Sequence, residues 1–267
     1  MRGASPVKKK HHLTLGVITF LVYVFLIGPL LIIMASSFGE QNALVFPGKG
    51  FTLKWYQQVF QLRSFINSAV LSIEIALAAT AIALLLGVPA AYAMNRYRFP
   101  GKNLIKTMFL SPVLIPCIVL GFIMLRYVIS RWNLSVIPSL LIGHTLLSIP
   151  YVMRVVTSSL ANFDFAMEEA AGSLGAARGY TFFHIVLPNI RSGIASACVM
   201  AVINSFNNVS LSTFLTAPGI TMLPIEIMGY VEYHFDPTIA ALATIMMLVT
   251  LGVMLLIEKT LGLQSVV

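Results

Sequence analysis

Charged residues are scarce in this chain: Asp, Glu, Lys and Arg make up 10% of its 267 residues, against 58% hydrophobic residues. Soluble domains carry about 25% charged residues, so this composition excludes an ordinary water-soluble fold. Cysteine is scarce as well. Cys117 and Cys198 both fall within long apolar runs, so no disulfide framework is expected.

The sequence also lacks the short motifs that carry catalysis. It contains no Gly-x-Ser-x-Gly elbow, no His-Glu-x-x-His, no paired intramembrane aspartates and no phosphate-binding loop. An intramembrane enzyme is therefore disfavoured. An ion-coupled secondary transporter is the other alternative, and it is disfavoured because no inverted repeat and few intramembrane charges are present.

What the chain has in abundance is long apolar segments. Runs of about 20 apolar residues cross the hydrocarbon core of a bilayer, and only a helix satisfies its own backbone there. We therefore expect an all-α membrane protein with a single transmembrane domain, 13–258, between a cytoplasmic N-terminal segment, 1–12, and a cytoplasmic tail, 259–267. The six predicted transmembrane helices are Leu13–Phe38, Asn67–Met94, Leu104–Leu125, Ile137–Val156, Ser192–Leu215 and Thr238–Ile257.

The net charge of +8 follows from how the basic residues are distributed. With the N-terminus inside, most of the 17 Lys and Arg residues fall in cytoplasmic segments, which is the asymmetry of the positive-inside rule. The basicity thus indicates topology and not a nucleic-acid partner. The basic residues expected outside are Lys49, Lys54, Arg63, Arg126 and Arg131.

Prolines and aromatic residues add local expectations. Pro112 and Pro116 are expected to kink the third helix, and Pro150 the fourth. In the external loop 39–66, aromatic residues follow Lys54, a pattern typical of a short helix at the membrane surface or of a loop that anchors its neighbours.

Polar residues gather in the predicted fifth helix. On a continuous helix, spacings of three and four would place most of them on one side, either lining a solute pathway or joining helices by hydrogen bonds. We favour pathway lining. The residues are Asn204, Ser205, Asn207, Asn208 and Ser212.

Glu74 is the acidic residue that lies well inside a predicted helix. A carboxylate at that depth is costly unless paired or hydrated, so it is either a pathway residue or a partner of Arg63, Arg126 or Arg131. His144 is interpreted as a packing residue, because no second ligand lies at metal-binding spacing.

The longest predicted cytoplasmic loop, about 161–190, is expected to contain a short docking helix. Asp164 can cap its start, Glu168 and Glu169 lie near its positive end, Arg178 near its negative end, and Gly179 is a natural stop. Small residues would form one side, which lets another protein approach the backbone closely: Ala166, Ala170, Ser173 and Ala177. An amphipathic connector resting on the bilayer is the alternative.

The stretch "EAAGSLGAARGYTFFHIVLP" resembles the EAA loop of permease subunits of binding-protein-dependent ABC importers. The family pattern is Glu-Ala-Ala, three residues, Gly, nine residues, then Ile-x-Leu-Pro. The matching positions are Glu169, Ala170, Ala171, Gly175, Ile185, Leu187 and Pro188.

This resemblance implies a type I importer permease fold (MetI-like) in the bacterial cytoplasmic (inner) membrane, with both termini cytoplasmic. It implies four kinds of partner: a second permease, two ATPase subunits, an extracytoplasmic binding protein and the lipid bilayer. This chain would hold no cofactor, since ATP and Mg would be bound by the ATPases. The residues implied to couple the permease to the ATPase are Glu168, Glu169, Ala170, Ala171, Ser173, Gly175, Arg178, Ile185, Leu187 and Pro188.

Within the family, "TLKWY", "YRFPGK", "LPIEIMGYV" and "PTIAALATIMML" are similar to the second permease of polyamine-type systems. Related members handle polyamines, ferric iron, thiamine, phosphonates or small organic solutes. Where polyamine importers carry adjacent acidic residues, this chain has Asn207 and Asn208. An amide offers hydrogen bonds without charge, so neutral, zwitterionic and anionic solutes stay open beside polyamines.

Overall fold

The structure, a computed structural model, describes the backbone of residues 6–261. Parts of the predicted N-terminal segment, 1–12, and of the predicted tail, 259–267, lie outside the described residues, so these boundaries stay predictions. Within the described range the chain is helical, and its one bridge pairs Ala217 with Ile220. The all-α class is confirmed.

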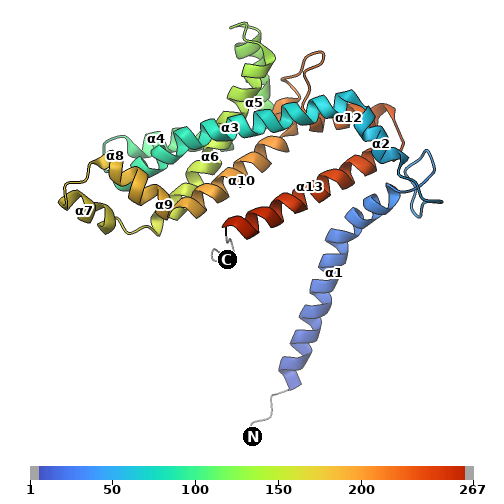
Figure 1. Ribbon diagram of the computed structural model, residues 1–267, viewed down its shortest axis with the longest axis horizontal. Coiled ribbons are helices and arrows are strands. Elements are labelled where there is room, and N and C mark those ends of the chain that lie inside the picture. Colours follow the sequence, from blue (N-terminus) through green and yellow to red (C-terminus); the bar gives the residue numbers. More distant parts are fainter. Residues whose placement is uncertain (1–5, 262–267) are drawn as a thin grey trace. The chain divides into compact units, whose positions relative to one another are not determined.

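Figure 1 colours the helices in chain order. In the bounds below, η marks 3₁₀ and π turns. Their bounds are α1 Pro6–Ser36, α2 Lys54–Gln61, α3 Arg63–Arg96, α4 Lys102–Leu110, η1 Ser111–Leu114, α5 Cys117–Ile123, η2 Met124–Ile129, α6 Val136–Ala161, α7 Ala166–Ser173, α8 Arg178–Thr181, η3 Phe182–Val186, α9 Leu187–Asn189, α10 Arg191–Phe206, α11 Val209–Ser212, α12 Leu223–Tyr233 and α13 Thr238–Leu261.

Among the described residues, three helices are long and apolar enough to cross a membrane: Leu15–Ser36 within α1, α3, and α6. Two further crossings are available if each of two sharply bent helix pairs counts as one span. The apolar part of α13, Thr238–Gly252, is shorter. Six crossings and two cytoplasmic termini therefore stay predictions.

The predicted third helix is not one kinked helix but two segments at 98° to each other. Ile115, between η1 and α5, is extended, with φ −87° and ψ 126°. The ring of Pro116 disfavours a helical conformation for the residue before it, and Pro112 has already tightened the preceding turn into η1. By contrast, α6 runs through Pro150 without a break.

The contacts divide the chain into two compact units, which we describe separately. The unit spanning Arg63–Gly229 is built on α3, α6 and α10, which lie side by side in Figure 1. Without a hydrophobic driving force between helices in lipid, small residues at the contact are what allow close packing. On α3 a fully buried row at helical spacing supplies them: Ala76, Ala79, Ala83 and Ala91.

The other unit contains the chain up to Leu62 and Tyr230–Leu256. Here α2 is the short helix expected in the external loop, and it is tied back to the end of α1. Trp55 Nε1 donates to the Gly39 carbonyl at 2.7 Å, and the hydroxyls of Tyr56 and Ser37 are 2.7 Å apart. The surface-helix interpretation is therefore confirmed as to secondary structure.

Candidate functional site

The predicted docking helix is shorter than expected and is followed by a second helix. It is α7, Ala166–Ser173, and its N-cap position is Phe165, which makes no side-chain cap hydrogen bond. Asp164, expected to cap the helix, lies one residue earlier, and its Oδ1 accepts the N–H of Ala166 at 2.9 Å. The helix ends at Ser173, so the placement of Arg178 near its negative end and of Gly179 as its stop is wrong. Both residues belong to α8, and Ala177 directly precedes α8.

Gly175 is what turns the chain after α7. Its φ is +86°, in the left-handed region, and the N–H of Ala176 bonds back to the Ala171 carbonyl at 3.0 Å. Glycine enters this conformation without the steric cost that a Cβ brings. The turn after α7 is therefore made by Gly175 and not by Gly179, which has no positive φ.

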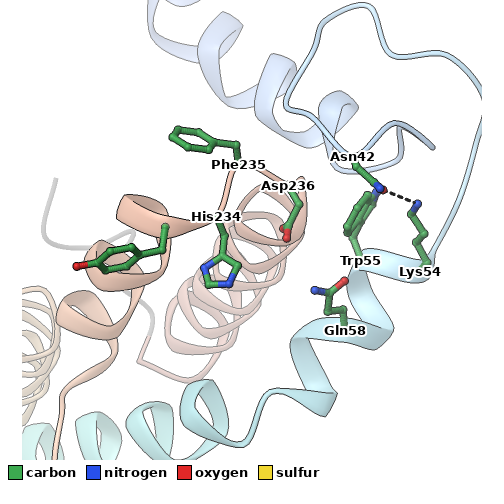
Figure 2. A pocket seen from close by; sticks show the side chains of 8 residues that line it. Asn42, Lys54, Trp55, Gln58, His234, Phe235 and Asp236 are labelled. Carbon is green, nitrogen blue, oxygen red and sulfur yellow. Dashed lines mark hydrogen bonds between the residues drawn. The ribbon is translucent and has the colours of Figure 1, made fainter.

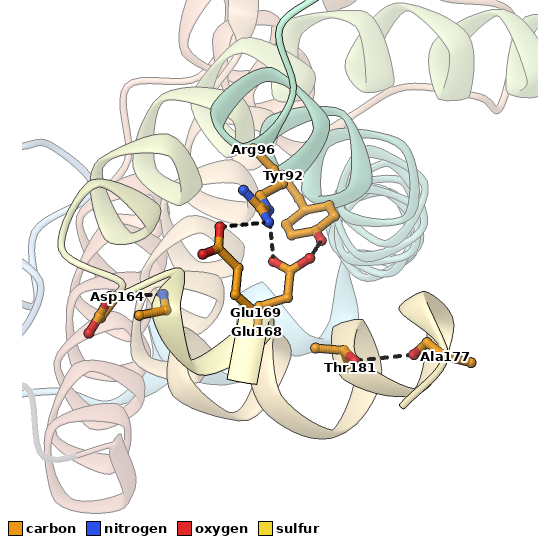
Figure 3. Close-up of polar contacts among 8 residues, drawn as sticks. Tyr92, Arg96, Asp164, Glu168, Glu169, Ala177 and Thr181 are labelled. Atoms are coloured by element: carbon orange, nitrogen blue, oxygen red, sulfur yellow. Dashed lines mark hydrogen bonds and ion pairs between the residues drawn. The ribbon is translucent and has the colours of Figure 1, made fainter. Parts of the chain in front are cut away.

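The two adjacent carboxylates at the start of α7 contact the C-terminal end of α3 (Figure 3). Tyr92 donates its hydroxyl to Glu168 Oε1 at 2.8 Å, Arg96 Nε lies 3.3 Å from Glu168 Oε2, and Arg96 Nη2 donates to Glu169 Oε1 at 3.1 Å. The Nε–Oε2 contact is an ion pair without hydrogen-bond alignment. We call these four residues the α3–α7 clamp.

Burial differs between the two carboxylates of the clamp. The side chain of Glu168 is 10% exposed, and that of Glu169 is 64% exposed. A buried carboxylate needs partners, and Glu168 has two of them, whereas Glu169 is largely solvated. Arg96 also lies over the ring of Phe165, 5.5 Å from its centroid, so it touches the residue directly before α7.

The rest of α7 is largely exposed and accessible to another protein. Ala166, Met167, Ala170 and Ser173 are exposed, and Leu174, directly after the helix, is 90% exposed. Ala171 is half-buried. A small-residue surface is thus present on α7 itself, although it is one residue shorter than predicted.

The Ile-x-Leu-Pro segment fastens the loop to the helical core. The chain 178–189 is helical throughout, with the π turn η3 before Pro188. Ile185 and Leu187 are half-buried and Pro188 is exposed, while the deepest anchors are Val186 and Ile190, at 0% and 1% exposure. A bend of 73° then leads into α10.

The predicted fifth helix is interrupted where its two adjacent asparagines lie. Helix α10 ends at Phe206, and α11 begins at Val209, with the Asn208 side chain accepting the N–H of Leu211 at 2.9 Å as an N-cap. Asparagine competes for backbone donors and favours such helix starts over helix interiors. The expectation of one continuous helix, Ser192–Leu215, is therefore wrong.

This interruption changes the surroundings of the polar residues. His144 of α6 is fully buried and joins two of them, with Nδ1 2.9 Å from Ser205 Oγ and Nε2 3.2 Å from Ser212 Oγ. Both serines are fully buried, which places them in helix packing within this unit. The interpretation of His144 as a packing residue is confirmed.

The asparagines of this region are more accessible than the serines. Asn204 and Asn208 are half-buried, and Asn207 is exposed. Asn208 Nδ2 also lies 3.8 Å from Cys117 Sγ at the start of α5, so the interruptions of the third and fifth spans are neighbours. Asn207 is the residue of this group best placed to meet a solute or another subunit.

Glu74 lies on α3, about 16 Å along the axis from the start of that helix. It is exposed, and within residues 6–261 it makes no ion pair with Arg63, Arg126 or Arg131. Asn67 and Ala81 are exposed at spacings of seven on the same side. An uncompensated charge facing lipid costs about 3 kcal/mol, so this side of α3 favours contact with protein or water.

A pocket of about 500 Å³ lies elsewhere, in the unit that contains α2 (Figure 2). None of the predicted coupling or pathway residues lines it. Next to it, Tyr230 donates to Asp236 Oδ2 at 2.9 Å, and burial raises the pKa of the Tyr230 phenol. The pocket residues are Asn42, Lys54, Trp55, Gln58, Tyr233, His234, Phe235 and Asp236.

Sequence reasoning missed Tyr92 and Arg96. In the sequence Arg96 is one of the basic residues expected on the cytoplasmic side, and nothing local distinguishes it from Arg98, two residues on. Its partners are more than 70 positions away, at Glu168 and Glu169. Only the fold brings these residues together.

Comparison with known proteins identifies the family of this chain. Residues 83–261 match the family described as binding-protein-dependent transport system inner membrane component. The chain is 31% identical over 243 residues to the spermidine/putrescine transport system permease protein PotC of Haemophilus influenzae, covering 89% of this chain and 92% of PotC. A Salmonella paratyphi A permease protein, PhnV, provisionally assigned to 2-aminoethylphosphonate transport, is 28% identical, with 91% of each chain covered.

The fold has a counterpart among solved structures. It is similar to a chain of a bacterial ABC transporter involved in the import of the acidic polysaccharide alginate, with a TM-score of 0.74 and 15% identity, over 97% of this chain and 99% of that one. Together with α7 and its Ile-x-Leu-Pro anchor, these similarities place the chain among type I importer permeases. The chain belongs to the binding-protein-dependent transport system inner membrane component family, and it is a permease subunit of an ABC importer.

Proposed function

We propose that α7, with Gly175 behind it, is the element through which this permease docks on a cytoplasmic ATPase subunit. The observation that carries this proposal is the exposed surface of small residues on α7, flanked by Leu174. Another protein can approach such a surface closely because no long side chain intervenes. Five of the other coupling residues hold this surface in place: Glu168 and Glu169 in the clamp, and Ile185, Leu187 and Pro188 in the anchor. Arg178 is exposed at the start of α8.

The assembly that we propose contains this chain, a second and different permease, two ATPase subunits and an extracytoplasmic binding protein, in the cytoplasmic (inner) membrane of a bacterium. This chain is non-catalytic, and ATP and Mg bind to the ATPase subunits. Closure of the ATPases moves the docking helices, the permeases turn outward, and the loaded binding protein releases its solute into the pathway.

For the pathway we propose Glu74, with Asn204, Asn207 and Asn208. Glu74 is a carboxylate inside a span whose side chain is exposed and has no ion-pair partner in the described part of the chain. Because lipid is an unfavourable environment for a carboxylate, Glu74 is better accommodated against the second permease or against the solute itself. Ser205 and Ser212 contribute indirectly, by holding His144.

The solute that we propose is a small molecule carrying a primary ammonium group. Spermidine, putrescine and 2-aminoethylphosphonate, named for the two relatives, share that group and differ in the rest of their charge. Glu74 supplies one negative charge for an ammonium, while the amides of Asn207 and Asn208 suit a zwitterion better than two adjacent carboxylates at those positions would.

Two measurements test this proposal. The first is purification of the importer with a tag on this chain: we expect the ATPase to copurify, and its absence would contradict the docking role. The second is mass spectrometry of the small molecule held by the partner binding protein. A ligand without an ammonium group would contradict the proposed solute class and leave the docking role standing.

A substitution separates the two interpretations of Glu74. We expect Glu74→Gln to leave assembly of the importer intact and to lower uptake, because the charge is lost while the shape is kept. Asn67→Ala, on the same exposed side, is the control for mere surface change. If Glu74→Gln instead releases the second permease, the carboxylate is an intersubunit contact.

A further inference from the structure

The α3–α7 clamp holds α7 in one rotational position. Glu168 and Glu169 are consecutive on a helix, so their side chains leave it about 100° apart. Arg96 contacts both, and Phe165 packs under the same guanidinium. A helix held at two directions around its axis cannot roll without breaking at least one contact.

The chain connections alone do not hold α7 in this way. Residues 162–165 separate it from α6, and residues 174–177, which include the left-handed Gly175, separate it from α8. Both connections are short non-helical segments. The clamp is therefore a direct side-chain attachment of α7 to a membrane-spanning helix, in addition to the packing of Phe163 and Phe165, in the preceding connection, against the hydrophobic core.

That helix is suited to carry a displacement across the membrane. Helix α3 is continuous over 34 residues, from Arg63 to Arg96, about 50 Å, which exceeds a hydrocarbon core of about 30 Å. Glu74 lies on the same helix, about 33 Å from Arg96. In contrast, the route from α7 through α8 meets the π turn η3 and the 73° bend before α10.

We propose that Arg96 and Tyr92 are positioning residues for coupling: they lock α7 to α3, so that a displacement of α7 by the ATPase moves α3 and the side of it that carries Glu74. This inference rests on the proposed function of α7. It assigns the carboxylates of the loop to this chain's own α3 and leaves the small residues of α7 as the surface for the ATPase.

The test uses the assembled importer with Arg96→Gln, which removes the charge and keeps a polar side chain. Arg98→Gln is the matched control, because Arg98 is exposed, lies two residues away and makes no ion pair within the described residues. Three quantities are measured: the amount of ATPase that copurifies, the stimulation of ATP hydrolysis by the loaded binding protein, and amide hydrogen exchange of residues 166–176.

For Arg96→Gln we expect the ATPase to remain bound and the basal hydrolysis to continue. Exchange of 166–176 should become about tenfold faster, because two charge-assisted contacts are lost. Stimulation by the binding protein should fall close to the basal rate. Arg98→Gln should match the wild type in all three quantities.

Graded variants distinguish transmission from a general loss of structure. Arg96→Lys keeps one point charge and should restore part of the stimulation, since an ammonium on a flexible stem does not reproduce the rigid planar fork of the guanidinium. Tyr92→Phe removes only the hydroxyl donor to Glu168 and should give a smaller loss than Arg96→Gln. Glu169→Gln should lose less than Glu168→Gln, because Glu169 is largely solvated.

Several outcomes would overturn the inference. Unchanged exchange in Arg96→Gln would show that the clamp does not hold α7. Faster exchange with full stimulation would show that the clamp does not transmit, and loss of the ATPase from Arg96→Gln but not from Arg98→Gln would assign these residues to docking. A wild-type importer that retains no ATPase would contradict the proposed function instead, and hydrogen exchange would still decide whether the clamp holds.

Discussion

At the scale of single residues, Gly175 ends α7 in a conformation that other residues enter at a cost. Gly175→Ala should destabilise the turn by about 1 kcal/mol, because a Cβ at φ +86° meets its own backbone. Apart from Gly175 and its two chain neighbours, no atom of the described residues lies within 4 Å of where that Cβ would be, so the effect is one of backbone conformation. Faster hydrogen exchange of residues 171–177 in the purified permease would measure it.

Gly172→Ala is the control for that prediction. Gly172 is inside α7, also has open space around it, and has no positive φ. Alanine should make α7 more stable here by about 1 kcal/mol, which slows exchange. Equal acceleration in both variants would contradict a role for the left-handed turn.

Asn208 is a second residue whose substitution affects local structure, because its side chain caps the N-terminus of α11. Asn208→Ala removes the N-cap of α11 and should cost about 1 kcal/mol of stability. Asn208→Ser retains an acceptor and should cost much less. Thermal unfolding of the permease with each variant measures the difference; equal midpoints would show that the cap is dispensable.

The same comparison shows why Asn207 is the cleaner position for testing solute contact. Asn207 is exposed, whereas a defect in Asn208→Ala could arise from the lost cap alone. The sequence placed both asparagines in one continuous helix and so could not separate the two roles. An amide that caps a helix and one that faces outward look the same in a sequence.

At the scale of elements, His144 joins three helices, α6, α10 and α11. Ser205→Ala leaves His144 Nδ1 without its partner in a fully buried position, which should lower stability by about 1 kcal/mol. Ser210→Ala is the control, because Ser210 is exposed and its side chain makes no hydrogen bond within residues 6–261. A lower thermal midpoint for Ser205→Ala alone is expected, and equal midpoints would contradict the network.

The elements also show what the sequence could and could not predict. Helices, the surface helix α2, and Asp164 at the start of α7 were predictable because apolar runs and capping residues are local signals. The breaks at Ile115 and at Asn207–Asn208 were not, since proline and asparagine are compatible with either a kinked or an interrupted helix. The partner of Glu168 could not be predicted at all, because it depends on how α3 and α7 come together in space.

At the scale of the whole molecule, the six-crossing topology makes a labelling prediction. In a variant with Cys117 and Cys198 replaced by serine, single cysteines are placed at three exposed positions: Trp132, Leu174 and Phe235. A membrane-impermeant thiol reagent applied to intact spheroplasts should label positions 132 and 235. Position 174 should react only after the membrane is opened.

This pattern tests the fourth and fifth crossings together, because position 174 lies between them in sequence. Labelling of position 174 from outside would place the loop on the wrong side for an ATPase. It would contradict the topology whatever the number of crossings elsewhere in the chain.

On α7 the charged residues contact α3 and the small residues are left for a partner, which predicts how the assembled importer responds to ionic strength. Both charges of α7 are engaged by Arg96, and the residues left for a partner are Ala, Met, Gly and Ser. Added salt screens attractions between exposed charges and leaves close apolar packing in place. The ATPase subunits should therefore stay attached during a high-salt wash that strips proteins held to a membrane by surface charge.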